Sequence, residues 1–182
     1  MRIIAGEFKG HTIKVPKSKL VRPTTDKTKE SIFNYLSNII DFENLKVLDL
    51  YAGSGALGLE ALSRGAAEVH FVEKNYPVYK NLIGNIDFLK VSHRTKIFKL
   101  SCIKFSSIKA NGGYDLILAD PPFFKDDIYE VVKNLKKNNY LNENGILLIE
   151  RSVQTKANDV NNFDIEPIKK LGDSLIYQFD FS

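Results

Sequence analysis

DLYAGSGALG (residues 49–58) follows a short apolar run and leads into apolar residues at helical spacing. A glycine-rich turn between a strand and a helix is the setting that a nucleotide-binding loop needs. Glycines permit a tight turn and let a ligand approach the backbone, while the start of the helix offers free N–H groups. Gly53 to Gly58 also fits the pattern G-x-G-x-x-G. The stretch predicts an α/β fold that binds an adenosine-bearing cofactor; the alternative is a tight turn without a ligand.

Strand and helix patterns alternate from residue 46 to residue 150. We expect strands at 46–51, 69–72, 95–100, 114–119 and 145–150. These runs are continuously apolar, as in parallel sheets covered by helices on both faces. Two more strands, near 163–169 and 174–181, would complete a seven-stranded, mostly parallel Rossmann-like sheet.

The first 45 residues are expected to extend this core. Residues 3–15 alternate loosely between apolar and polar types and predict a short β-hairpin, and 26–40 predict an amphipathic helix. We therefore expect one domain over 1–182, in which 1–45 is an N-terminal extension and 46–182 is the catalytic core.

Acidic residues stand at the ends of two predicted strands. Glu73 lies twenty residues after Gly53, where a carboxylate can accept hydrogen bonds from ribose hydroxyls. DPPF (residues 120–123) ends the strand at 114–119, on the sheet edge where ligands bind. Asp120 can accept a hydrogen bond from an N–H group, the prolines stiffen the loop, and the Pro121 carbonyl can accept a second bond. Phe123 can stack on a base. An ordinary Pro-Pro turn is the alternative.

These motifs resemble a known family. DPPF is similar to the motif of amino-methyltransferases. RPTTD (22–26), Glu30, Phe33-Asn34 and AGSGALGLEALSRGA (52–66) resemble the bacterial 16S rRNA guanine-N2 methyltransferases. The resemblance runs from Ala5 to Tyr177. It implies a class I methyltransferase fold, S-adenosylmethionine as donor with S-adenosylhomocysteine as product, no metal, and methylation of a guanine N2 amine.

The resemblance also implies roles for individual residues. The catalytic residues would be Asp120, Pro121 and Phe123. The cofactor-binding residues would be Asp49, Tyr51, Ala52, Gly53, Ser54, Gly55, Glu73, Cys102 and Asp120. The substrate contacts would be Arg2, Lys9, Lys14, Arg22, Thr24, Pro122 and Phe123. Many relatives hold the adenine amine with Asp or Asn after the third strand, whereas this chain has Leu100-Ser101-Cys102 there. Ser101 or the Cys102 backbone N–H would replace it.

Charge is concentrated in two segments. Residues 1–30 hold eight basic and three acidic side chains, whereas the rest of the chain holds 18 and 19. Residues 90–109 add six basic side chains and no acidic one. Basic segments on a near-neutral body favour a polyanionic partner. The resemblance makes that partner 16S rRNA, in the small ribosomal subunit or an assembly intermediate, bound by a monomer. Two solvated faces without a partner are the alternative.

Several classes are disfavoured. One cysteine excludes an intrachain disulfide, and His11, His70 and His93 have no zinc-ligand spacing. No apolar run is long enough for a signal peptide or a membrane span, so we expect no membrane partner and a cytoplasmic location.

Three rival functions are open. A DNA adenine-N6 methyltransferase would use the same DPPF chemistry, but it usually needs a separate target-recognition region, for which the chain has no room. A nicotinamide-dependent oxidoreductase would leave residues 120–123 without a role. A non-catalytic RNA-binding or ribosome-assembly protein on the same fold is disfavoured by the joint presence of Asp49, Glu73 and Asp120.

Overall fold

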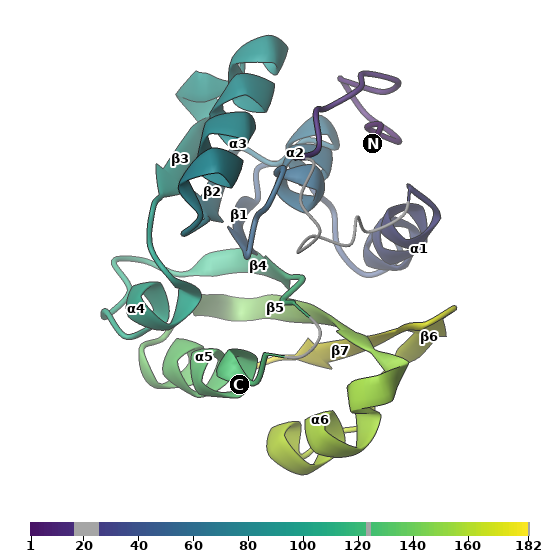
Figure 1. Ribbon diagram of the computed structural model, residues 1–182, viewed down its shortest axis with the longest axis vertical. Coiled ribbons are helices and arrows are strands. Elements are labelled where there is room, and N and C mark those ends of the chain that lie inside the picture. The colour runs from purple at the N-terminus through teal and green to yellow at the C-terminus, as the bar shows by residue number, and fades with distance from the viewer. Residues whose placement is uncertain (17–25, 123–124, 182) are drawn as a thin grey trace.

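The computed structural model of the chain describes residues 1–16, 26–122 and 125–181. Within these ranges the chain forms a seven-stranded sheet in the order β3-β2-β1-β4-β5-β7-β6 (Figure 1). The strands are β1 (Lys46–Leu50), β2 (Glu68–Val72), β3 (Thr95–Phe98), β4 (Tyr114–Ala119), β5 (Leu141–Ser152), β6 (Lys169–Leu171) and β7 (Ser174–Phe179). The helices are α1 (Asp26–Leu36), α2 (Ala56–Ser63), α3 (Tyr76–Leu89), α4 (Cys102–Ser106), α5 (Asp127–Lys137) and α6 (Lys156–Phe163), with short 3-10 turns η1 (Ser92–Arg94) and η2 (Val153–Thr155).

The sheet is mostly parallel, as the sequence predicted. Strands β1 to β5 pair in parallel, whereas β7 runs antiparallel to both β5 and β6. Residues 47–50 of the central strand β1 are all buried. Strands buried on both faces carry apolar side chains on both, which is why they form continuous apolar runs in the sequence.

Helices cover both faces of the sheet. Figure 1 shows α1, α2 and α3 on one face and α4, α5 and α6 on the other. Successive side chains of β1 point to opposite faces: Val47 packs in the core cluster of α1, α2 and α3, whereas Leu48 and Leu50 pack in the cluster of α4, α5 and α6.

The N-terminal segment, of which residues 1–16 are described, packs onto this core. Ile3 and Ile13 are each 1% exposed and belong to the core cluster of α1, α2 and α3. Within the segment the chain turns back on itself and makes one antiparallel bridge, between Arg2 and Thr12. The predicted hairpin is thus reduced to a single bridge, because backbone groups between its two arms bond to α2 instead.

A buried carboxylate on α2 makes much of that attachment. Glu60 accepts hydrogen bonds from the backbone N–H groups of Ile4 at 2.8 Å and Ala5 at 3.1 Å. It also forms ion pairs with Lys29 of α1 and with Arg64, each at 3.0 Å. The side chains of Glu60 and Lys29 are fully buried. One carboxylate therefore ties the N-terminal segment, α1 and α2 together.

The C-terminal part differs from the sequence-based expectation. Residues 163–169 were expected to form a strand, but Phe163 ends α6, and β6 begins only at Lys169. The sequence did not predict α6, because that helix is anchored by a polar residue. Asp159 of α6 is fully buried and pairs with Arg151 of β5 at 2.9 Å. The helix expected over 26–40 also ends earlier, at Leu36.

Candidate active site

The carboxyl ends of three central strands lie level at one edge of the sheet. Leu50 ends β1 and pairs with Val72, which ends β2, and with Ala119, which ends β4. The residues that follow these three strand ends are Tyr51, Glu73 and Asp120. Ligands of parallel α/β sheets bind at this edge. The register therefore brings together the three motifs that the sequence analysis selected.

The loop between β1 and α2 is a tight turn that depends on two glycines. Gly53 and Gly55 have φ angles of 56° and 82°, in the left-handed region. A Cβ on Gly55 would lie 2.5 Å from Cδ1 of Leu82 on α3, which shows that α3 packs closely against the loop at Gly55. Among the described residues, a Cβ on Gly53 would meet only the Tyr51 carbonyl oxygen, at 3.8 Å. Space above Gly53 is thus open to a ligand.

Two carboxylates hold this loop in place. Asp49 Oδ2 accepts a hydrogen bond from the backbone N–H of Gly58 in the first turn of α2, at 2.8 Å. Glu73 Oε2 accepts the N–H of Gly53 at 3.1 Å, and its Oε1 accepts the N–H of Asn75 at 2.7 Å. Both carboxylates therefore shape the loop itself, in addition to any contact with a ligand.

The surroundings of Asp49 raise its pKa. Burial raises its pKa well above 3.8, the Gly58 N–H opposes the shift, and the charges of Asp120 and Glu73 add to it. Three carboxylates thus lie near enough to influence one another at the strand ends. Such a cluster favours a positively charged ligand.

These residues fit S-adenosylmethionine. Gly53 leaves open space, Glu73 offers carboxylate oxygens next to it, and Gly55 caps α2 without a side-chain hydrogen bond. The sulfonium and ammonium groups of the cofactor are cationic, which matches the three carboxylates. Tyr51, the residue after β1, has a φ of 58°, in the left-handed region. Its ring packs against the core cluster of α4, α5 and α6.

The loop after β4 begins with the predicted acceptor residues. Asp120 is half-buried, Pro121 is buried and Pro122 is exposed. The Pro122 carbonyl accepts a hydrogen bond from the Lys125 backbone N–H at 3.0 Å, which tightens the loop. Phe123 lies outside the described residues.

The region after β3 is occupied by α4. Ser101 caps this helix, because its Oγ accepts the Lys104 N–H at 3.2 Å. One acceptor position of the Ser101 hydroxyl is therefore already used. As the first residue of α4, Cys102 has no acceptor for that N–H within its own helix. Its thiol is buried, and burial raises the pKa of Cys102, so the thiol stays neutral.

The predicted substrate residues lie partly in the described regions. Arg2, Lys9 and Lys14 are exposed. Arg22 and Thr24 lie outside the described residues. The N-terminal segment contacts the second basic segment, because Arg94 Nη1 pairs with Glu7 at 3.2 Å.

Three aromatic rings lie together where the N-terminal segment meets α3. The His11 ring centroid lies 6.2 Å from that of Phe8 and 6.1 Å from that of Phe88, near the end of α3. Phe88 is 59% exposed. The N-terminal segment thus contacts the second basic segment through Arg94 and the end of α3 through Phe88.

One residue near the loop was missed by the sequence analysis. Asn85 of α3 is 2% exposed, and its Nδ2 donates to the Ser54 carbonyl at 2.9 Å. A signal for it existed: Asn85 lies on the same helical face as Leu82 and Leu89, so it is a polar residue on an apolar stripe.

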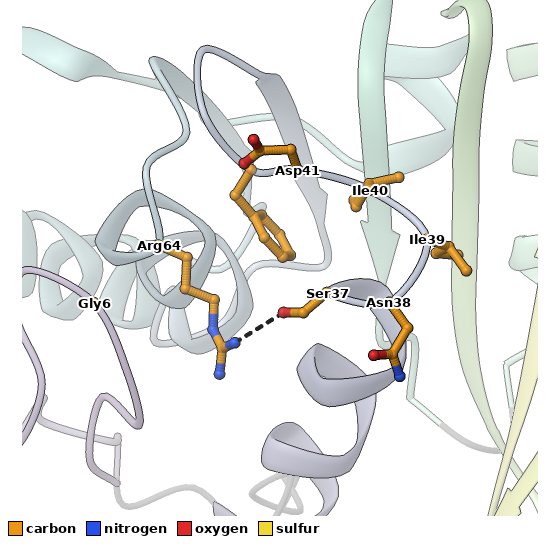
Figure 2. Close-up of a pocket in the computed structure, with 8 residues that line it drawn as sticks. Gly6, Ser37, Asn38, Ile39, Ile40, Asp41 and Arg64 are labelled. Atoms are coloured by element: carbon orange, nitrogen blue, oxygen red, sulfur yellow. Dashed lines mark hydrogen bonds between the residues drawn. The ribbon is translucent and has the colours of Figure 1, made fainter.

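An open hollow of about 640 Å³ lies away from this edge. Figure 2 shows it between Arg64, at the C-terminal end of α2, and residues 37–42. Arg64 Nη1 donates to Ser37 Oγ at 3.2 Å, and its Nε pairs with Glu60. None of the predicted site residues that the structure describes lines the hollow. The guanidinium of Arg64 thus already has protein partners at the hollow.

Two kinds of feature are absent from the described ranges. Among residues 1–16, 26–122 and 125–181, no group of three or more His, Cys, Asp or Glu side chains could hold a metal ion. In the same part of the chain, every helix is too short or too polar to cross a membrane.

Comparison with known proteins connects this geometry to a family. A family model described as "Conserved hypothetical protein 95" matches residues 1–180. The chain is 35% identical over 154 residues to the ribosomal RNA small subunit methyltransferase D of Escherichia coli (strain K12), covering 85% of this chain and 76% of the relative. It is 36% identical over 152 residues to the protein of that name from Haemophilus influenzae, covering 82% and 78%.

Solved structures support the fold. One from Escherichia coli, whose name proposes a methyltransferase, superposes with a TM-score of 0.80 at 29% identity and covers 98% of this chain and 96% of its own. A ribosomal protein L11 methylase from Lactobacillus delbrueckii has a TM-score of 0.67 at 16% identity, covering 84% and 76%, and shares the fold alone.

Proposed function

The chain belongs to the Conserved hypothetical protein 95 family, a family of bacterial rRNA methyltransferases, and from that membership we propose that it methylates a guanine N2 amine in 16S rRNA, with S-adenosylmethionine as donor. One observation carries the proposal. The level ends of β1, β2 and β4 put the glycine loop, Glu73 and Asp120 at one edge, where a donor site and an acceptor site would adjoin.

The donor side would be held by the loop. Ala52, Gly53, Ser54 and Gly55 would supply backbone contacts, Glu73 would accept the ribose hydroxyls, and the Cys102 N–H would contact the adenine. Bound there, S-adenosylmethionine supplies an electrophilic methyl group on a positively charged sulfur. Asp49 would act through the backbone of α2, because its carboxylate is bonded to Gly58.

The acceptor side would orient the amine. A guanine N2 lone pair is delocalised into the ring and is a poor nucleophile. If the Asp120 carboxylate and the Pro121 carbonyl accept the two N–H bonds, the nitrogen can direct its lone pair toward the methyl carbon. The amine nitrogen would then accept the methyl group as the bond of that group to sulfur breaks, and the extra proton on nitrogen would leave to Asp120 or to water. Positioning and charge at Asp120 would account for much of the acceleration. Pro122 and Phe123 would contact the base.

The RNA would be held outside this pocket. Arg2, Lys9 and Lys14 are exposed on the N-terminal segment, which meets α3 through the ring contact of His11 with Phe88. Basic side chains contact phosphates, and exposed rings can stack on unpaired bases. Arg94 is bonded to Glu7, Leu62 and Ala66, so its role is structural.

Transfer of labelled methyl groups tests the proposal. Purified protein is incubated with isotope-labelled S-adenosylmethionine and one of three substrates: small subunits, free 16S rRNA from a strain lacking the gene, or duplex DNA. The proposal predicts label in rRNA or subunits, recovered as N2-methylguanosine after digestion. Label recovered as N6-methyladenine in DNA would replace it with the rival methyltransferase function.

A further inference from the structure

Asn85 joins two segments that the proposed function assigns to different tasks. Its Nδ2 donates to the carbonyl oxygens of Lys14 and Ser54, both at 2.9 Å. Its Oδ1 accepts the Lys14 backbone N–H, also at 2.9 Å. Ser54 belongs to the glycine loop, and Lys14 belongs to the basic N-terminal segment. A single side chain therefore bridges the donor loop and the RNA-facing segment.

The amide can make these bonds in only one orientation. Lys14 presents both a donor and an acceptor to it, as a neighbouring β-strand would. Turning the amide over would bring Oδ1 against two carbonyl oxygens and Nδ2 against an N–H. A third acceptor, Asn81 Oδ1, is farther away at 3.4 Å. Since Asn85 is 2% exposed, water cannot readily replace a missing partner.

Helix α3 holds Asn85 in place. The helix has 14 residues, is capped by Asn75 and packs Leu82 against Gly55. We therefore expect a displacement of the Ser54 carbonyl to move the Asn85 side chain rather than α3. A movement of that side chain would disturb its two bonds to Lys14.

We propose that Asn85 is a positioning residue that couples cofactor binding to RNA docking. This inference rests on the proposed function and deepens it. When the glycine loop takes its ligand-bound shape, Asn85 fixes the backbone at Lys14, which presents the basic segment to RNA. By thermodynamic reciprocity, docked RNA strengthens cofactor binding by the same factor.

A ratio of affinities measures this coupling. The Kd of S-adenosylhomocysteine is determined by calorimetry with and without saturating small-subunit RNA, so that no turnover occurs. In the wild-type protein we expect RNA to tighten binding by about fivefold or more, as is typical of coupled sites. In Asn85→Ala the ratio should fall to about one. A merely structural role for Asn85 would weaken binding in both conditions and leave the ratio unchanged.

Asn134→Ala is the matched control, because it also removes an amide hydrogen bond, of 3.3 Å to Ser106, but on α5. It should keep the wild-type ratio. Asn85→Asp keeps the acceptor for the Lys14 N–H and removes both donors, so it should abolish the coupling as the alanine variant does.

A second measurement needs no variant. Hydrogen exchange at the Lys14 amide in the wild-type protein should slow when S-adenosylhomocysteine binds. A wild-type ratio of one, a retained ratio in Asn85→Ala, or unchanged exchange at Lys14 while the glycine loop becomes protected would overturn the inference. Failure of the proposed function is distinguishable, because the wild-type protein would then transfer no methyl group to rRNA.

Discussion

Asp49 and Gly58 are joined by a 2.8 Å hydrogen bond from the Gly58 backbone N–H to Asp49 Oδ2, inside a region where Asp49 is 2% exposed. The bond fixes the start of α2 relative to β1. It also keeps a carboxylate in an environment that disfavours its charge, because burial raises the pKa of Asp49.

Replacing Asp49 with asparagine should change the pH dependence of stability. A carboxyl whose pKa is raised by folding contributes stability that is complete below its ordinary pKa and is lost as the pH rises through the raised value. Asn keeps an oxygen that can accept the Gly58 N–H and removes the charge. Without cofactor, Asp49→Asn should therefore melt at a higher temperature than the wild type at pH 7, and the gap should close toward pH 4. Melting curves that stay parallel to the wild type over this range would contradict the account, and Asp87→Asn, at an exposed site on α3, is the control.

Glu73→Ala should weaken binding of S-adenosylhomocysteine. The change removes the acceptor of the Gly53 N–H together with the proposed acceptor of the ribose hydroxyls. The expected loss is about 1–3 kcal/mol, the range for leaving buried polar groups unpaired. Calorimetry measures it, and Glu143→Ala, at an exposed position of β5, should bind like the wild type. Unchanged affinity in Glu73→Ala would remove Glu73 from the cofactor site.

Lys29→Met should destabilise the fold strongly. The side chains of Lys29 and Glu60 are fully buried and 3.0 Å apart, and removing Lys29 leaves the buried Glu60 carboxylate with Arg64 as its remaining ion-pair partner. The expected loss in the free energy of unfolding is therefore up to about 3–5 kcal/mol, the range for breaking a buried ion pair, measured by urea titration. Arg2→Ala tests the comparison, because its pair with Asp26 spans 3.8 Å and the Arg2 side chain is 70% exposed. That variant should lose about 0–1 kcal/mol. Equal losses in the two variants would show that the buried ion pair contributes no more to the free energy of unfolding than the exposed one.

The basic N-terminal segment should control the salt dependence of RNA binding. Lysines that bind phosphates release counterions, so alanine at Lys9, Lys14, Lys17 and Lys19 should flatten the slope by about 0.7–0.9 for each phosphate interaction that is removed. The affinity for S-adenosylhomocysteine should stay within a few fold in the absence of RNA. Filter binding over a range of salt concentrations measures the slope.

The control set removes an equal number of lysines, all exposed, from elements distant from the glycine loop. It consists of alanine substitutions at Lys133, Lys136, Lys137 and Lys170. It should keep the wild-type slope. If the N-terminal variant keeps both the slope and full methylation, the segment is only a solvated face.

The fold was predictable where local pattern and tertiary environment agree. The parallel strands have apolar runs that match their burial, and the glycine loop follows β1 at the expected place. Helix α6 was not predictable, because its anchor is Asp159, paired with Arg151, and a polar anchor has no hydrophobic period. The N-terminal hairpin was overestimated, because the acceptor for Ile4 and Ala5 is Glu60, which lies 55 or more residues away.

The candidate site, like the fold, was predictable from the sequence only in part. Asp49 could be found because it is the penultimate residue of a recognisable strand, and Glu73 and Asp120 because each directly follows one. Asn85 could not be assigned, because its partners are backbone groups at Lys14 and Ser54, and a sequence pattern does not reveal which backbone groups meet.

Asp120→Ala should separate binding from chemistry. The proposed role of Asp120 is to hold the amine, so the affinity for S-adenosylhomocysteine should remain within a few fold while the methyl-transfer rate collapses. Calorimetry and single-turnover transfer measure the two quantities. Parallel loss of both would assign Asp120 a structural role in the cofactor pocket.

The most direct test of the central claim is mass mapping of small-subunit rRNA from cells. rRNA from a strain lacking the gene is compared with rRNA from that strain carrying either the wild-type gene or Asp120→Ala. The account predicts a guanosine that gains one N2 methyl group with the wild-type gene and stays unmethylated with the variant. An rRNA methylation pattern that is identical in all three strains would contradict it.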